Sequence, residues 1–315
     1  MNKGQFNNIF LSAVILMTVA SVSVFSQKSA TGTSQVRGIT ITTEPGAVVW
    51  LDDLRYGRTS KSGNFTIDAM PPGAHKIRVR ADGFKETTYP ISAAVRGEVK
   101  IALVKTNDPA ELAFQEAERL SAVDRDAAIA AYRKAIKLKP NYTTAYISLA
   151  RVLADAQDPD GAKKALQDLR KVSPRNAEAS AVEGRILKDL GDEEKAIAAF
   201  KRSIAEGRGV QPEAYTGLGL LYKERGEGSG GDPEIESTNF AEASKNLKIA
   251  LKQLGSAPDA LVLYQLLGLV YERQGKYQEA IDLYRECLRY FPNSNESVAI
   301  RSFIDQLEKK LAQKD

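Results

Sequence analysis

Cysteine and histidine are almost absent from this chain, which holds one of each, Cys287 and His75, among 315 residues. A single cysteine cannot form an intramolecular disulfide, and the sequence offers no Cys/His set with the spacing of a zinc site. The phosphate-binding P-loop, the GxSxG nucleophile elbow and the HExxH metalloprotease helix are also missing from the sequence. We therefore expect a protein that is not an enzyme, with no catalytic or metal-binding residues and no cofactor.

The chain also has little excess of positive over negative charge, with 44 lysines and arginines against 40 aspartates and glutamates. The formal net charge is only +4, whereas nucleic-acid binding normally needs a concentrated basic face. An apolar fraction of 43% beside 27% charged residues is typical of a folded soluble protein. These values argue against a nucleic-acid partner and against a disordered chain.

The first 26 residues have the pattern of an export signal. Lys3 precedes the uncharged apolar stretch Ile9–Phe25, and a polar linker follows at 27–35. At 17 residues the stretch is at the short limit for crossing a bilayer, so an uncleaved membrane anchor is the main alternative. A buried helix is a third reading, but the stretch shows no amphipathic pattern. Both leading interpretations predict an exported protein of the bacterial periplasm or cell envelope.

Alternating apolar and polar residues predict a small β-domain over residues 36–104. Ile77, Val79 and Ala81 alternate with basic residues, which indicates a strand with one buried and one solvated face. Glycine and proline punctuate the segment where turns are needed. Several short strands at this spacing predict a small antiparallel β-sandwich.

Four motifs at turns follow one another in this segment, namely Glu44-Pro45-Gly46-Ala47, Tyr56-Gly57-Arg58-Thr59, Met70-Pro71-Pro72-Gly73-Ala74-His75 and Asp82-Gly83-Phe84. With this order of turns the segment resembles the PEGA domain, a family named after the first of these motifs. The resemblance implies a structural or binding role without a known active site. The usual Asp-Gly hairpin is replaced here by Asp52-Asp53, which leaves the turn type open.

Three basic residues, Lys76, Arg78 and Arg80, alternate along one predicted strand and would line up on one face. Such a row is suited to an anionic envelope polymer or to phospholipid head groups. The alternative is the ordinary solvated face of an outer strand. Trp50 alternates with Val48 and is expected to anchor the core.

A helical region begins at Asp108-Pro109, where aspartate can cap the free amides and proline fits the first turn. From there the sequence repeats, because Ala128, Ala162 and Ala196 are each 34 residues apart. A period of 34 residues is typical of tetratricopeptide repeats.

The last repeat resembles the tetratricopeptide pattern most fully, and four earlier segments resemble it in part. We therefore predict five repeats over 109–293, forming an all-α superhelix, and a C-terminal capping helix over 294–315. The Gly/Ser-rich, acidic segment 227–239 is expected to be a mobile loop at a hairpin tip. The matching residues of the last repeat are Tyr264, Leu267, Gly268, Tyr271, Gly275, Tyr277, Ala280, Tyr284 and Pro292.

The family resemblance implies a ligand groove on the concave surface made by the first helices of successive repeats. Basic residues there would suit an acidic peptide or a chain-terminal carboxylate, although a solvated helix face is the alternative. We predict a non-catalytic adaptor that holds a protein or peptide partner in this groove. The second hypothesis is an envelope glycan- or anionic-lipid-binding module in which the array is a spacer. The predicted groove residues are Arg151, Arg185, Lys188, Leu220, Lys223 and Leu269.

Overall fold

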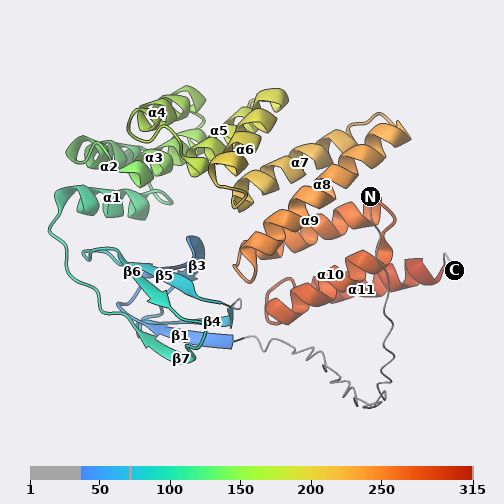
Figure 1. Ribbon diagram of the computed structural model, residues 1–315, viewed down its shortest axis with the longest axis horizontal. Coiled ribbons are helices and arrows are strands. Elements are labelled where there is room, and N and C mark those ends of the chain that lie inside the picture. Colours follow the sequence, from blue (N-terminus) through green and yellow to red (C-terminus); the bar gives the residue numbers. More distant parts are fainter. Residues whose placement is uncertain (1–36, 71–72, 314–315) are drawn as a thin grey trace, which may run out of the picture. The chain divides into compact units, whose positions relative to one another are not determined.

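The computed structural model describes residues 37–70 and 73–313, in which a β-domain precedes a helical array (Figure 1). The expected export signal at 1–26 and linker at 27–35 lie outside the described residues. In the described part of the chain, none of the helices is both long and apolar enough to span a membrane.

The β-domain consists of two sheets. One has the strand order β4-β1-β7 and the other the order β3-β2-β5-β6. All neighbouring pairs are antiparallel except β1 and β7, which run parallel, so the expected wholly antiparallel sandwich differs from the structure at this edge. The strands are β1 (Arg37–Thr42), β2 (Val48–Leu51), β3 (Leu54–Arg58), β4 (Asn64–Met70), β5 (His75–Arg80), β6 (Thr87–Ile91) and β7 (Gly97–Lys100).

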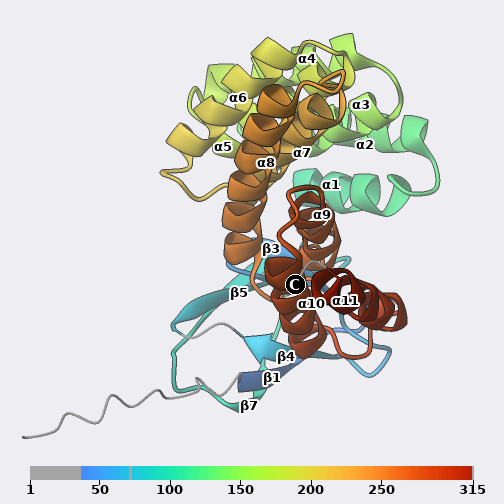
Figure 2. The same cartoon turned by 90° about the vertical axis from the view of Figure 1, so that its right-hand side faces the viewer.

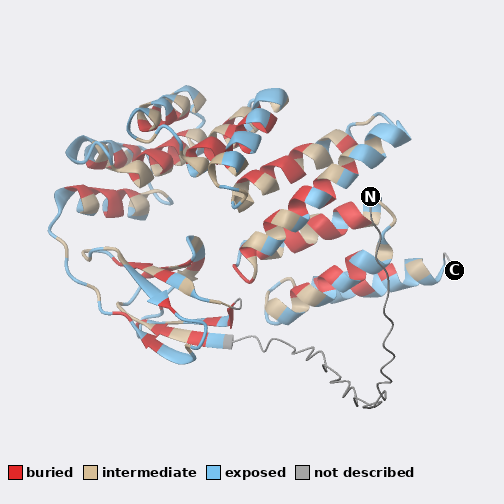
Figure 3. Ribbon diagram, viewed as in Figure 1, coloured by how far each residue is buried: buried red, intermediate tan, exposed pale blue. Residues whose placement is uncertain are grey.

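The alternation seen in the sequence produces the core of the β-domain. Ile77 and Val79 of β5 are fully buried, as are Ile41 of β1 and Val49 of β2. Period-two strands present every second side chain to the opposing sheet, so these residues face inward together. Figure 3 shows that buried residues occur in both the strands and the helices.

The β2–β3 turn is built on Asp52-Asp53. Both residues have positive φ, 48° and 69°, as a two-residue type I′ hairpin turn requires. Asp52 is held by neighbours from β5, because its carboxylate lies 2.5 Å from His75 Nδ1 and accepts a hydrogen bond from Lys76 N at 2.9 Å. These contacts fix a left-handed conformation that aspartate adopts less readily than glycine.

Eleven helices in the described residues follow the β-domain as five antiparallel hairpins and a final single helix. Their small residues allow close packing, since a Cβ added to Gly184 would lie 2.6 Å from the ring of Phe200. They are α1 (Pro109–Leu120), α2 (Arg125–Leu138), α3 (Thr143–Asp155), α4 (Pro159–Val172), α5 (Ala177–Asp189), α6 (Glu193–Glu206), α7 (Pro212–Glu227), α8 (Pro233–Leu254), α9 (Ala260–Arg273), α10 (Tyr277–Tyr290) and α11 (Ser297–Ala312).

The segment 227–239 is mostly helical, so the prediction of a long loop was wrong. Helix α8 begins at Pro233 and has 22 residues, which makes α7 and α8 the longest hairpin (Figure 2). Asp232 caps α8 by accepting hydrogen bonds from Glu234 N and Ile235 N at 3.0 and 3.2 Å. The capping aspartate and the proline after it start a helix that extends the hairpin, and the glycines at 228–231 form only its turn.

Candidate functional site

The concave positions of the array follow from its repeat register. Each first helix carries a small buried residue, Ala or Gly, where it packs on its own second helix. The residue that follows it in the sequence is rotated about the helix axis toward the concave face. The pairs are Ala117-Glu118, Ala150-Arg151, Gly184-Arg185, Gly219-Leu220 and Gly268-Leu269, on α1, α3, α5, α7 and α9.

Arg151 joins three successive first helices. Its guanidinium donates to both carboxylate oxygens of Glu213 on α7, at 2.9 and 2.6 Å, and to Glu178 on α5 at 3.3 Å. Burial disfavours the charged guanidinium, yet Glu213 and Glu178 outweigh it and raise the pKa of Arg151 above its ordinary value. Arg151 therefore ties the second, third and fourth repeats together.

The other predicted basic groove residues also have carboxylate partners. Lys188 on α5 donates to Glu224 on α7 at 3.2 Å, and Lys223 donates to Glu227 on its own helix at 2.8 Å. Arg185 is held more loosely, with Nη2 3.6 Å from Asp155. A partner carboxylate would have to displace one of these acids, so the groove is not an open basic surface. Its binding of an acidic peptide stays a prediction.

A cavity of about 590 Å³ lies at the C-terminal end of the concave face. Two predicted residues, Lys223 of α7 and Leu269 of α9, line it, and Leu269 is 47% exposed. Among the described residues Arg273 has no ion-pair partner, and it is exposed on the cavity wall. The remaining lining residues are Glu227, Glu236, Phe240, Val270, Glu272, Tyr277 and Lys310.

The lining combines apolar side chains with charges of both signs. Lys310 of α11 pairs with Glu272 of α9, which holds the capping helix against the last repeat. The cavity volume falls within the range of about 300–1,000 Å³ typical of ligand sites. Paired charges around an exposed leucine suit a polypeptide segment that brings an apolar side chain and polar backbone groups.

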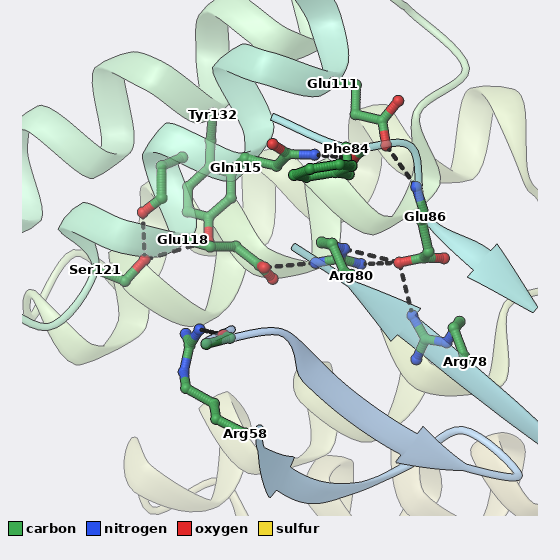
Figure 4. A network of polar contacts seen from close by, with 12 residues as sticks. Arg58, Arg78, Arg80, Phe84, Glu86, Glu111, Gln115, Glu118, Ser121 and Tyr132 are labelled. Carbon is green, nitrogen blue, oxygen red and sulfur yellow. Dashed lines mark hydrogen bonds and ion pairs between the residues drawn. The ribbon is translucent and has the colours of Figure 1, made fainter. Parts of the chain in front are cut away.

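The basic row of the β-domain lies differently from the prediction. Lys76 is exposed, but Arg78 is partly buried and Arg80 is only 7% exposed. The prediction of a solvent-facing row was wrong for Arg80, because its guanidinium faces helix α1 and donates to Glu118 at 2.5 Å (Figure 4). A buried arginine paired in this way is not available to an envelope polymer.

Trp50 is half-buried, and its ring contacts the guanidinium groups of two arginines of the row. The guanidinium carbons of Arg78 and Arg80 lie 4.2 and 5.0 Å from its ring centroid. Stacking on an aromatic face is a favoured contact of the planar guanidinium. The alternation with Val48 predicted burial of Trp50 and did not reveal these two contacts.

In the described residues there is no group of three or more histidine, cysteine, aspartate or glutamate side chains arranged to hold a metal ion. Cys287, in α10, is fully buried, and burial together with Glu286 and Glu296 raises its pKa to about 12. The thiol is therefore protonated and shielded, which makes a nucleophilic role physically unfavourable.

Family models match both parts of the chain. Three tetratricopeptide repeat models match residues 119–186, 177–205 and 262–294. The helical part is an array of tetratricopeptide repeats. Residues 31–104 match the model of the carboxypeptidase regulatory-like domain, and the PEGA assignment stays a prediction.

Known proteins resemble mainly the tetratricopeptide array. A TPR repeat-containing protein of Methanocaldococcus jannaschii, MJ1428, is 37% identical over 116 residues, which are 36% of this chain and 18% of that protein. The chain thus spans less than a fifth of this relative. The structure of yeast Tom70 aligns with 65% of this chain and 41% of its own, at 19% identity and a TM-score of 0.54. The MamA protein aligns with 59% of this chain and 94% of its own, at 23% identity and a TM-score of 0.42. The likeness to Tom70 shows the fold and confirms the predicted superhelix.

Sequence reasoning missed the acids that neutralise the tetratricopeptide groove. Glu213 and Glu224 on α7 lie near Arg151 and Lys188, 62 and 36 residues away in the sequence. The repeat register carried a signal for them, since these acids also stand on first helices. Charge pairs between repeats depend on how far the superhelix turns per repeat, which the sequence pattern did not provide.

Proposed function

We propose that this protein is a non-catalytic scaffold that holds a polypeptide segment of a partner at the C-terminal end of the tetratricopeptide groove. The observation that carries the proposal is the cavity of about 590 Å³ at the concave positions Lys223 and Leu269. Tetratricopeptide folds generally act in protein–protein interaction, which agrees with this site.

The structure supports a narrower binding surface than the row of basic residues predicted from the sequence. Arg151 and Lys188 form ion pairs with carboxylates of other repeats, so we assign them to stabilising the curvature of the groove. Leu269 and Arg273 remain exposed at the cavity and are the residues we assign to the partner. The apolar side chain of Leu269 beside the exposed guanidinium of Arg273 fits a segment with an apolar and an acidic side chain.

A matched pair of variants tests this assignment. Leu269→Ser removes an exposed leucine inside the cavity, and Val262→Ser removes an exposed valine of the same helix outside it. Each full-length variant is used to capture proteins from an envelope extract, and captured proteins are identified by mass spectrometry. We expect one protein to be captured by the wild type and by Val262→Ser and to be lost with Leu269→Ser. Equal capture by the two variants would refute the cavity as the binding surface.

We further propose that the protein is exported and acts in the periplasm or cell envelope. The support is the charge-free stretch Ile9–Phe25 after Lys3, with an uncleaved anchor as the alternative form. Cell fractionation with an antibody against the tetratricopeptide array checks this, and recovery in the cytoplasm alone would contradict it. The mass of the N-terminal peptide distinguishes a cleaved signal from an anchor.

The second hypothesis, envelope glycan or anionic-lipid binding by the β-domain, has less support. Arg80 is buried against the array, and Arg78 is shared between Trp50, Asp53 and Glu86. Of the three residues in the predicted row, only Lys76 is exposed. One exposed lysine contributes about 1 kcal/mol at an anionic membrane, too little for stable attachment.

A further inference from the structure

The β-domain contacts the concave face of the first repeat through Arg80. Its guanidinium lies between two aromatic rings, Trp50 of its own domain and Phe114 of α1, at 5.0 and 4.7 Å from their centroids. It bonds to Glu86 of the β-domain and to Glu118 of α1, at 2.7 and 2.5 Å (Figure 4). An arginine buried in this way is fully partnered, with aromatic and carboxylate groups supplied by both sides.

Side chains of helix α1 also form hydrogen bonds with backbone groups of the segment that follows β5. Gln115, itself 4% exposed, accepts from Gly83 N and donates to Phe84 O, both at 2.8 Å. One turn earlier, Glu111 accepts from Glu86 N at 3.0 Å. The three α1 side chains Glu111, Gln115 and Glu118 follow one another at intervals of four and three residues, so they lie on one face of the helix. This face contacts the β-domain.

Glu118 occupies a ligand position of the array. It follows the small residue Ala117, as Arg151 follows Ala150 and Leu269 follows Gly268. In the first repeat, Glu118 at this concave position is paired with Arg80 of the same chain, whereas Leu269 at the corresponding position of the last repeat is exposed at the cavity.

The β-domain has a second contact, at the corner between α8 and α9. Ser256 bonds to the carbonyl oxygen of Ala69, and the hydroxyl of Tyr56 lies 3.3 Å from the same serine. Buried apolar residues of the β-domain and of α8–α11 also form one continuous cluster. The β-domain therefore contacts the first repeat by polar groups, and it contacts the corner before the last repeat by hydrogen bonds and by apolar packing.

We propose that the β-domain is an intramolecular ligand of the array, with Arg80 bound to Glu118 at the concave position of the first repeat and the domain bracing that repeat against the α8–α9 corner. The brace would fix the curvature of the repeats in between. It would also confine an external partner to the C-terminal cavity. A basic partner side chain could reach Glu118 and Phe114 only by displacing Arg80.

Amide hydrogen exchange on the full chain tests the docking directly. The amides of Gly83 and Glu86 donate to α1 side chains, whereas that of Lys85 donates to Val104 O within the β-domain at 2.7 Å. In Arg80→Gln we expect Gly83 and Glu86 to exchange at least about tenfold faster while Lys85 stays protected. Arg78→Gln is the matched control, since Arg78 also stacks on Trp50 but its recorded partners all belong to the β-domain.

Unchanged exchange at Gly83 and Glu86 in Arg80→Gln would overturn the proposal, as would unprotected exchange of both amides in the wild type. If Arg80→Gln also exposes Lys85, the β-domain itself has unfolded. In that case Glu118→Ala, which changes a residue of α1 and leaves the β-domain sequence intact, replaces Arg80→Gln in the test. Exchange at the amides of Gly83 and Glu86 is measured again, and the same outcomes decide.

Spin labels on two exposed residues, Lys134 of α2 and Lys309 of α11, test the brace. We expect one narrow distance distribution in the wild type and in Arg78→Gln, and a broader one in Arg80→Gln. The same narrow distribution in all three proteins would show that the β-domain does not control curvature.

Discussion

Gly184 shows how single residues set the spacing of this array. A Cβ at this position would lie 2.6 Å from ring carbons of Phe200, a side chain that is itself only 1% exposed. The same relation links Gly219 with Leu247, where the added atom would lie 2.6 Å from Leu247 Cγ. Each small residue and the large side chain opposite it therefore act as a pair.

We expect Gly184→Ala to lower the free energy of unfolding by about 1–3 kcal/mol, because the added methyl group overpacks the hairpin. In an exposed helix the same change would instead stabilise by roughly 0.5–1 kcal/mol. Urea denaturation of the two proteins measures the difference. The double variant Gly184→Ala/Phe200→Leu should recover part of the loss, and no recovery would show that the two residues do not share one space.

At the scale of the element, α8 illustrates a helix whose start is specified by its cap. Asp232→Ala removes the acceptor for Glu234 N and Ile235 N, and we expect it to cost about 1 kcal/mol of stability. Asp259→Ala is the control, because Asp259 precedes α9 without a side-chain capping bond. Equal losses in the two variants, measured by urea denaturation, would contradict the capping role of Asp232.

The last hairpin, α9 and α10, carries three groups whose protonated forms are favoured by the fold. Burial, with a smaller contribution from Glu272, raises the pKa of Tyr284 to about 12. Burial likewise raises the pKa of Tyr264, and it raises that of Cys287 to about 12. The corresponding values in an unfolded chain are about 10 for tyrosine and 8.5 for a thiol.

These shifts predict alkaline destabilisation. Above the unfolded pKa values the unfolded chain has lost protons that the folded hairpin still binds, so stability falls as the pH rises. Below about pH 8 both states are protonated and the contribution is fully present. We expect the melting temperature to drop by about 5 °C between pH 8 and pH 11, and by less in Tyr284→Phe. A melting temperature that is flat over this interval would be the contrary result.

At the scale of the whole molecule, ion pairs link the first helices of different repeats. Arg151→Met keeps the apolar stem but leaves Glu213 and Glu178 without their guanidinium, and we expect a loss of about 1–2 kcal/mol. Lys223→Met is the matched control, since its partner Glu227 lies on the same helix and such pairs contribute only about 0.3–0.5 kcal/mol. Denaturation curves for both variants decide whether the contact between repeats carries the larger share.

The architecture could be predicted from local patterns in the sequence. Period-two alternation placed Ile77 and Val79 in a sheet, and the 34-residue spacing of Ala128, Ala162 and Ala196 identified the repeats. Both patterns arise from the geometry of a single strand or a single hairpin, which neighbouring residues determine. The helical start of α8 was missed because glycine and serine composition was given more weight than the cap at Asp232.

Sequence alone determined that this chain has a sandwich-like β-domain, a tetratricopeptide array and no paired cysteines to stabilise either part. Only the tertiary structure decided which charged side chains are available to bind a partner. Arg80 faces Glu118, 38 residues away, and Arg151 faces Glu213, 62 residues away, so neither arginine is a free binding group. Local patterns fix which face of a helix or strand a side chain occupies, whereas its partner depends on how the β-domain and successive repeats pack together.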